Sequence, residues 1–136
     1  VIVDCPPSLN LLKINGMVAA VCVLVPLQSE FFALEGLSQL MLSIREVRQT
    51  ANPRLRIEGV VLTMYDRRNN LSRQVEDDAR ENLGNLVFDT IIPRNVRVSE
   101  APSYSMPVLR YDPSSQGSRA YKELATEMLR RHADAA

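Results

Sequence analysis

The first seven residues, Val1-Ile2-Val3-Asp4-Cys5-Pro6-Pro7, constrain the fold more than any other stretch. Three apolar β-formers before a carboxylate predict a strand that is buried on both faces, as in a parallel α/β sheet, with Asp4 at its carboxyl end. Ligands bind at that end of such sheets, and in phosphate-handling folds a carboxylate there holds a magnesium ion or its bound water. The alternative interpretation is that Asp4 caps the helix that follows.

The remainder of the chain alternates predicted strands and helices. Apolar runs predict strands at residues 21–25, 57–64 and 87–92, and amphipathic spacing predicts helices at residues 8–20, 32–50, 71–83 and 115–131. This alternation implies parallel βαβ units with right-handed crossovers. We therefore expect one α/β unit with an open, mostly parallel sheet and helices on both faces.

Several local features sharpen this expectation. Pro26 should end the second strand and turn residues 28–30 toward the ligand crevice, because proline cannot donate to a sheet. The proline-rich stretch 94–113 reads as a long functional loop, with a short edge strand at residues 108 and 109. The last helix should turn five residues inward: Ala120, Tyr121, Leu124, Met128 and Leu129.

Composition excludes some classes of protein. The chain has 136 residues, of which 46% are apolar, so it can bury a sizeable core. Its formal net charge is zero, and only a local basic patch could attract nucleic acid. No apolar run reaches the roughly 18 residues that span a bilayer. Cys5 and Cys22 read as small buried residues of a reduced protein, and His132 as a solvated tail residue.

The sequence contains few residue patterns that indicate a catalytic or binding site. The sequence contains no Gly-x-x-x-x-Gly-Lys-Ser/Thr stretch, so the chain as given cannot cradle a triphosphate alone. Arg67, Arg68 and Arg73 bracket a loop and a helix start, with Asp66 the only acid among them. Both a solvated surface and a contact with phosphate backbones fit this pattern.

Five stretches, in order, resemble the carboxyl-terminal part of the ParA-type (Soj-like) partitioning ATPases, which have a deviant Walker A P-loop NTPase fold. They are Val-Ile-Val-Asp-Cys-Pro-Pro-Ser, Val-Pro-Leu-Gln-Ser-Glu-Phe-Phe-Ala-Leu-Glu-Gly-Leu, Ile-Glu-Gly-Val-Val-Leu-Thr-Met-Tyr-Asp, Ile-Ile-Pro-Arg-Asn-Val-Arg-Val-Ser-Glu-Ala-Pro-Ser and Tyr-Asp-Pro-Ser-Ser-Gln-Gly. Because the chain starts without Met, inside a predicted strand, we expect residues 1–136 to be the carboxyl-terminal part of a single nucleotide-binding domain. In this family the phosphate-binding loop precedes the first of these stretches.

The resemblance implies roles for individual residues. Asp4 matches the Walker B carboxylate, which acts in catalysis and holds Mg²⁺. Arg68 matches a position implicated in sequence-independent DNA binding, in which Arg67 and Arg73 would help. The remaining matched positions are those expected to bind the nucleotide: Pro6, Pro7, Thr63, Met64, Pro93 and Arg94. The family commonly has Gly where this chain has Ser105, so the conformation of that loop is in question.

The resemblance also implies a function. The family binds ATP or ADP with Mg²⁺, forms an ATP-bound homodimer, and sits on non-specific DNA of the bacterial nucleoid in the cytoplasm. A ParB-type partner stimulates hydrolysis and releases it. Residues 1–136 alone should be inactive, since the loop that grips phosphates is absent from them. The alternative is a non-catalytic α/β interaction module that uses no nucleotide.

Overall fold

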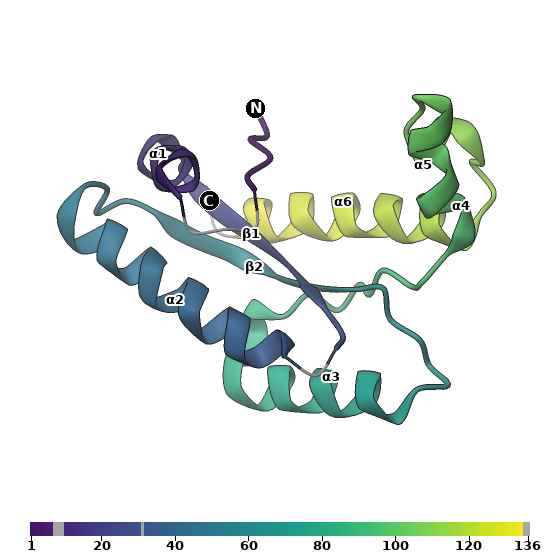
Figure 1. Ribbon diagram of the computed structural model, residues 1–136, viewed down its shortest axis with the longest axis horizontal. Coiled ribbons are helices and arrows are strands. Elements are labelled where there is room, and N and C mark those ends of the chain that lie inside the picture. The colour runs from purple at the N-terminus through teal and green to yellow at the C-terminus, as the bar shows by residue number, and fades with distance from the viewer. Residues whose placement is uncertain (7–9, 31, 135–136) are drawn as a thin grey trace.

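The computed structural model describes residues 1–6, 10–30 and 32–134 and shows the expected alternation of strands and helices (Figure 1). Two strands and six α-helices are described, together with two short 3₁₀ helices. They are α1 (Leu11–Ala19), β1 (Cys22–Gln28), α2 (Ala33–Thr50), β2 (Arg56–Thr63), α3 (Asn70–Leu83), η1 (Gly84–Leu86), α4 (Val96–Glu100), η2 (Ala101–Tyr104), α5 (Val108–Tyr111) and α6 (Gln116–Asp134).

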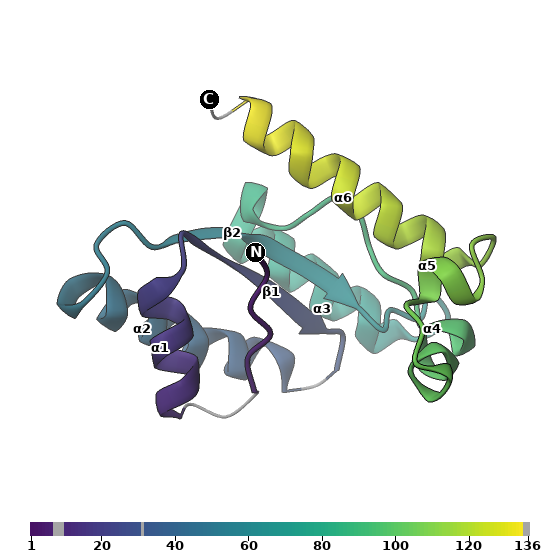
Figure 2. The same ribbon diagram turned by 90° about the horizontal axis from the view of Figure 1, so that it is seen from above.

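β1 and β2 form a parallel pair that runs from Cys22 opposite Arg56 to Gln28 opposite Thr63, with one register shift between Val23 and Leu24. The segment 87–93 runs along the other edge of β2. α2 and α3 lie on one face of the strands and α6 on the opposite face (Figures 1 and 2). The prediction of a parallel sheet with helices on both faces is therefore confirmed.

β2 is buried on both faces, because its side chains alternate between the two helical layers. Val60 and Leu62, each 0% exposed, join the apolar cluster under α2 and α3. Val61 points the other way, into the cluster with Phe88 and α6. The α6 residues in that second cluster are Ala120, Leu124 and Met128.

The first residues form no strand, so the prediction of a buried strand there is wrong. Ile2 is 98% exposed, and Val1 and Val3 are also exposed. This segment instead approaches α1, where a Cβ placed on Gly16 would lie 3.0 Å from the Cys5 sulfur. A strand needs a hydrogen-bonded neighbour, and no strand of the described residues pairs with this one.

Pro26 does not end its strand, contrary to the prediction, because β1 continues to Gln28. Arg56 N donates to Val21 O and Ser29 N donates to Thr63 O, so the odd-numbered residues of this strand direct their backbone N–H and C=O groups toward β2. The nitrogen of Pro26 therefore faces the open edge of β1, where no ladder donor is required.

Residues 87–92 were expected to form a strand, but they make only isolated bridges with the β2 side, at Val87 and at Pro93. Phe88 N donates to Val60 O at 2.8 Å and Ile92 N to Leu62 O at 2.9 Å. Between them, Glu127 of α6 accepts the amides of Asp89 and Thr90, at 2.9 and 2.8 Å. These two amides are thus drawn toward α6 and away from β2, which interrupts the ladder.

Two further predictions near the carboxyl end are wrong. Val108 and Leu109 lie in α5 and not in an edge strand. Tyr121 and Leu129 are 37% and 73% exposed, because Glu127 and Leu124 occupy the face of α6 that turns inward. His132 is exposed, as expected, and its Nε2 also lies 2.9 Å from Glu58 Oε1. Glu58 is the residue skipped by the register between β1 and β2, and such a bulge re-aims its side chain.

Among the described residues, no helix combines the length and the apolar character that a membrane span requires.

We predict that Glu127→Gln lowers the free energy of unfolding by roughly 2–4 kcal/mol, because a buried group that accepts two amides and an arginine loses its charge. Burial alone raises the pKa of Glu127, but hydrogen bonds from Thr90, Asp89 and Arg131 lower it to about 2. Since the folded-state pKa lies below the ordinary value of 4.5, this stabilisation is present above pH 4.5 and disappears as the pH falls toward 2. Urea unfolding at pH 7 and pH 3 measures both effects. Glu123→Gln, at an exposed position of α6, is the control, and equal stability of both variants at pH 7 would contradict this role.

Candidate functional site

The ends of β2 and of the segment 87–94 meet at the carboxyl edge of the sheet. Tyr65 N donates to Ile92 O at 3.2 Å, and Arg94 N donates to Tyr65 O at 3.0 Å. The backbone therefore brings together four residues predicted to contact the nucleotide: Thr63, Met64, Pro93 and Arg94. Met64 has a φ of 51°, a left-handed conformation that is costly for a residue with a side chain and that often marks a functional turn.

Residues at the end of β1 reach the same edge, as expected. Arg94 Nη2 lies 3.7 Å from Glu30 Oε1, and Gln28 Nε2 donates to the same oxygen at 2.7 Å. The side chains of Glu30 and Arg94 are both more than half exposed, so the pair is weak. Its geometric effect is to link β1 to residue 94 across the end of β2. The sequence placed Glu30 near the crevice but did not identify Arg94 as its partner.

Ser29 fixes this corner from inside. It is 3% exposed, and both its amide and its hydroxyl donate to Thr63 O, at 3.3 and 3.4 Å. Its own carbonyl accepts the hydroxyl of Ser72 at 3.5 Å. The ends of β1 and β2 and the first turn of α3 are thereby held together.

Asp4 and Pro6 do not join this edge. Asp4 is exposed on the segment beside α1, and Pro6 is half-buried; Pro7 lies outside the described residues. A carboxylate oxygen is a suitable ligand for Mg²⁺. However, no group of three or more His, Cys, Asp or Glu side chains gathers into a metal-binding cluster among residues 1–6, 10–30 and 32–134. Among the described residues, Asp4 is thus an isolated carboxylate away from the edge where residues 63–65 and 92–94 meet.

The arginines predicted to bind DNA lie on the turn between β2 and α3 and on the first turn of α3. Arg67, Arg68 and Arg73 are all exposed. Arg68 Nε lies 3.2 Å from Asp66 Oδ1, and this contact lowers the pKa of Asp66. Arg73 donates to the side-chain oxygen of Asn70. Arg67 and Arg68 thus lie on the exposed turn, with Arg68 paired to Asp66, and Arg73 lies on the first turn of the helix that follows.

Tyr65 anchors that turn to α3, a contact that the sequence pattern does not indicate directly. It is 7% exposed and donates from its hydroxyl to Glu76 Oε2 at 2.6 Å, while Arg80 Nε donates to Glu76 Oε1 at 3.0 Å. Burial, then the hydrogen bond to Glu76, raises the pKa of Tyr65 to about 12. The sequence feature that could have indicated this contact is the pair Ser72 and Glu76, two polar residues four positions apart beside the apolar face of α3.

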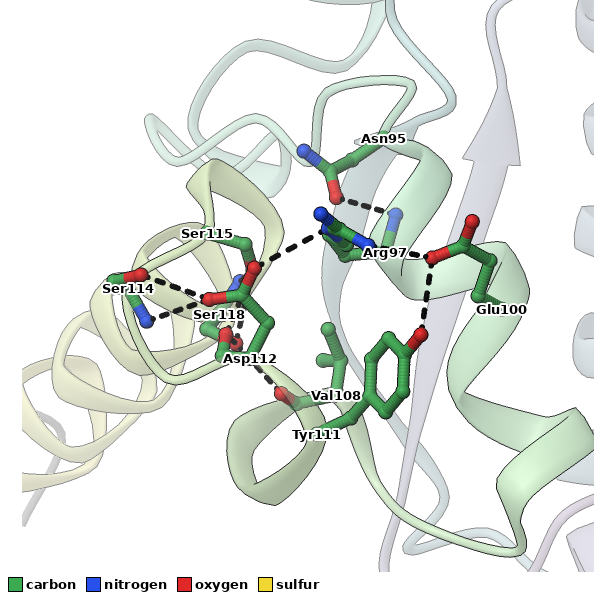
Figure 3. Close-up of polar contacts among 9 residues, drawn as sticks. All are labelled: Asn95, Arg97, Glu100, Val108, Tyr111, Asp112, Ser114, Ser115 and Ser118. Carbon is green, nitrogen blue, oxygen red and sulfur yellow. Dashed lines mark hydrogen bonds and ion pairs between the residues drawn. The ribbon is translucent and has the colours of Figure 1, made fainter.

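A polar network fastens the stretch after Arg94 to the start of α6 (Figure 3). Arg97 contacts Glu100 Oε2 at 3.0 Å and Asp112 Oδ2 at 3.4 Å, and the hydroxyl of Tyr111 donates to the same Glu100 oxygen at 3.2 Å. The hydroxyl of Ser118, which is fully buried, lies 2.6 Å from Asp112 O and 2.9 Å from Val108 O. These contacts hold residues 95–112 as a series of short helices, where a long ordered loop was expected.

Ser105 follows η2 with a φ of 54°, in the left-handed region that favours glycine. Its amide donates to Pro102 O at 2.9 Å. The left-handed conformation explains why the resembled family commonly has Gly at this position, since Gly adopts this backbone geometry at lower cost than Ser.

We predict that Gly117→Ala destabilises this network by about 1–3 kcal/mol through overpacking. A Cβ on Gly117 would overlap Val98 Cγ2, so the Val98 side chain or α4 itself would have to shift. Gly36→Ala is the matched control, because a Cβ there meets nothing within 4 Å and alanine favours helix. Thermal unfolding of both variants measures the difference. A Gly117→Ala protein as stable as Gly36→Ala would show that α4 does not depend on this close approach.

Known proteins match the chain along nearly its whole length. A family model described as an AAA domain matches residues 1–57. The chromosome partitioning protein ParA of Caulobacter vibrioides is 62% identical over 134 residues, which cover 98% of this chain and 50% of that protein. Over nearly its whole length the chain is thus similar to proteins of the ParA/Soj family. The sporulation initiation inhibitor protein Soj of Bacillus subtilis is 50% identical over 94% of this chain and 51% of its own length. The chain thus spans about half the length of the curated relatives it matches.

Solved structures share the fold of this chain. Cobyrinic acid a,c-diamide synthase of Mycobacterium smegmatis is 36% identical, with a TM-score of 0.75 over 98% of this chain and 47% of that protein. The same enzyme with bound ADP and magnesium gives a TM-score of 0.73. The cell division ATPase MinD of Pyrococcus furiosus, 23% identical with a TM-score of 0.74 over 93% of this chain and 50% of its own, shares the fold. The prediction of a partial MinD-like P-loop NTPase fold is confirmed.

Proposed function

We propose that the protein is a DNA-segregation ATPase of the ParA type, which binds ATP or ADP with Mg²⁺. The observation that carries the proposal is the 62% identity to ParA over 98% of the chain. The carboxyl edge supports it, because parallel sheets bind their ligands there and the structure brings residues 63–65 and 92–94 together at that edge.

In this proposal the nucleotide base lies against the turn at Thr63 and Met64 and the corner at Pro93 and Arg94. Backbone groups supply much of the recognition there, and Arg94 adds a guanidinium that Glu30 orients. Asp4 is the Walker B carboxylate and the magnesium ligand, and Pro6 and Pro7 form the loop after it. Bound Mg²⁺ would neutralise charge on the phosphates.

Arg68, with Arg67 and Arg73, forms the DNA contact of the proposed protein. Guanidinium groups bind phosphates without reading bases, so this contact is independent of sequence. The active species is an ATP-bound homodimer on the nucleoid, in the bacterial cytoplasm. A ParB-type partner stimulates hydrolysis and releases the dimer from DNA.

Residues 1–136 by themselves should not hydrolyse ATP. They contain no phosphate-binding loop, and electrostatic stabilisation of the transferred phosphoryl group is most of this catalysis. Phosphate release from ATP and Mg²⁺ measures the activity. Adding the part of Caulobacter vibrioides ParA that this chain does not match, with and without its loop lysine, is the control, and turnover should need that lysine. Robust turnover by residues 1–136 alone would overturn the assignment.

Arg68→Glu, introduced at the matching position of a full-length relative, should abolish binding to duplex DNA and leave nucleotide binding intact. Each lost phosphate contact also reduces the steepness with which affinity falls with salt. Filter binding to two unrelated duplexes across a salt series measures this, and fluorescent ADP reports on nucleotide binding. A reversal at the exposed Arg119 of α6 is the matched control. Unchanged DNA retention in the Arg68 variant would mean that these arginines are only solvated surface.

A further inference from the structure

A groove lies at the amino end of the sheet, between the last turns of α2 and the start of β2. Its volume is about 470 Å³. Its floor is apolar, made by Met41, Ile44 and Ile57, with Pro53 at one side. Arg45 and Arg48 form the rim. In Figure 1 this end of α2 lies opposite the turn between β2 and α3 that carries the proposed DNA contact.

The rim carries unpaired positive charge. Arg45 and Arg48 are exposed, and so is Arg54, which follows Pro53. Within the described part of the chain, none of their side chains donates a hydrogen bond or forms an ion pair. Glu46 is the only acidic residue from 44 to 55. By contrast, the arginines elsewhere that hold the fold, Arg80, Arg97 and Arg131, all contact carboxylates.

Stabilisation of α2 explains only part of this charge. Arg48 lies in the last turn of α2, where a cation interacts favourably with the helix dipole. Arg54 lies after the helix and gains nothing from that dipole.

We infer that this groove binds an acidic amphipathic peptide segment of a partner protein, with apolar side chains against Met41 and Ile57, the part of the floor that is not fully buried, and carboxylates on Arg45, Arg48 and Arg54. A polynucleotide would satisfy the arginines but leave the apolar floor empty. A lipid surface is flat, whereas the apolar residues here line a concavity. Apolar anchors within a ring of charge pairs are the usual anatomy of a peptide groove.

The test uses a fluorescein-labelled peptide of Leu and Glu at helical spacing, titrated with the purified protein and followed by anisotropy. Arg45→Ala/Arg48→Ala should weaken binding roughly tenfold, because two charge pairs are lost. Arg45→Lys/Arg48→Lys should retain most of the affinity, since the charges remain. Arg119→Ala is the matched control at an exposed arginine outside the groove. Circular dichroism of each variant checks that α2 is intact.

The alternatives give different results. Equal affinity for a peptide with Lys in place of Glu, or with Ser in place of Leu, would overturn the inference. So would an unchanged affinity in the alanine double variant. If the same variants lose binding to phosphatidylglycerol vesicles or to duplex DNA but not to the peptide, the groove serves a lipid surface or a nucleic acid, and the inference is again wrong.

Discussion

The burial of β2 on both faces is the constraint on which the other elements depend. Val60, Val61 and Leu62 are all 3% exposed or less, and they point alternately to the two sides of the sheet. Each such side chain contributes roughly 1.5–3 kcal/mol when it leaves water. That gain requires a helical layer on each side, which α2 and α3 supply on one face and α6 on the other. β2 is thereby held between the two helical layers, and the turn that follows it starts from a fixed position.

Buried polar groups then determine the irregular parts that the apolar layers leave undefined. Ser29, Ser118 and Glu127 are each 6% exposed or less, and each accepts or donates to backbone groups of a different segment. Among the described residues no buried side-chain nitrogen or oxygen lacks a partner. An unsatisfied group of this kind would be costly, so these contacts select one path for residues 87–118 among the many that the apolar core would tolerate.

Much of the fold could be predicted from local pattern, because α2, α3 and β2 carry strong periodicities and clear ends such as Gly84. The predictions are wrong where a residue far away in the sequence determines the local structure. The ladder at residues 87–92 is interrupted by Glu127, almost forty positions away, and Glu127 also takes the inward face of α6 that Tyr121 was expected to share. Val1 to Val3 read as a strand, but a strand forms only beside a partner.

The contacts of the candidate site also divide into those that the sequence predicts and those that it does not. The meeting of Thr63 and Met64 with Pro93 and Arg94 follows from a general rule, since neighbouring parallel strands end at one edge. The pairing of Glu30 with Arg94 and the anchoring of Tyr65 by Glu76 depend on side-chain directions that sequence spacing does not encode. The position of Asp4 depends on whatever packs beside the first segment.

Charge distribution separates the arginines that build the fold from those that can serve a partner. The chain has no net charge, yet its guanidinium groups are not equivalent. Arg131 is 24% exposed in its side chain, contacts Glu127 at 2.7 Å and lies 4.1 Å from the ring centre of Phe88. Arg68 is 91% exposed and held only by Asp66. A phosphate could replace Asp66 at little cost, because an exposed pair is already screened by water. Replacing Glu127 at Arg131 would strip a buried carboxylate of its partner. The exposed arginines at the two ends of the sheet are thus among those that a polyanion or an acidic segment can reach without unfolding the chain.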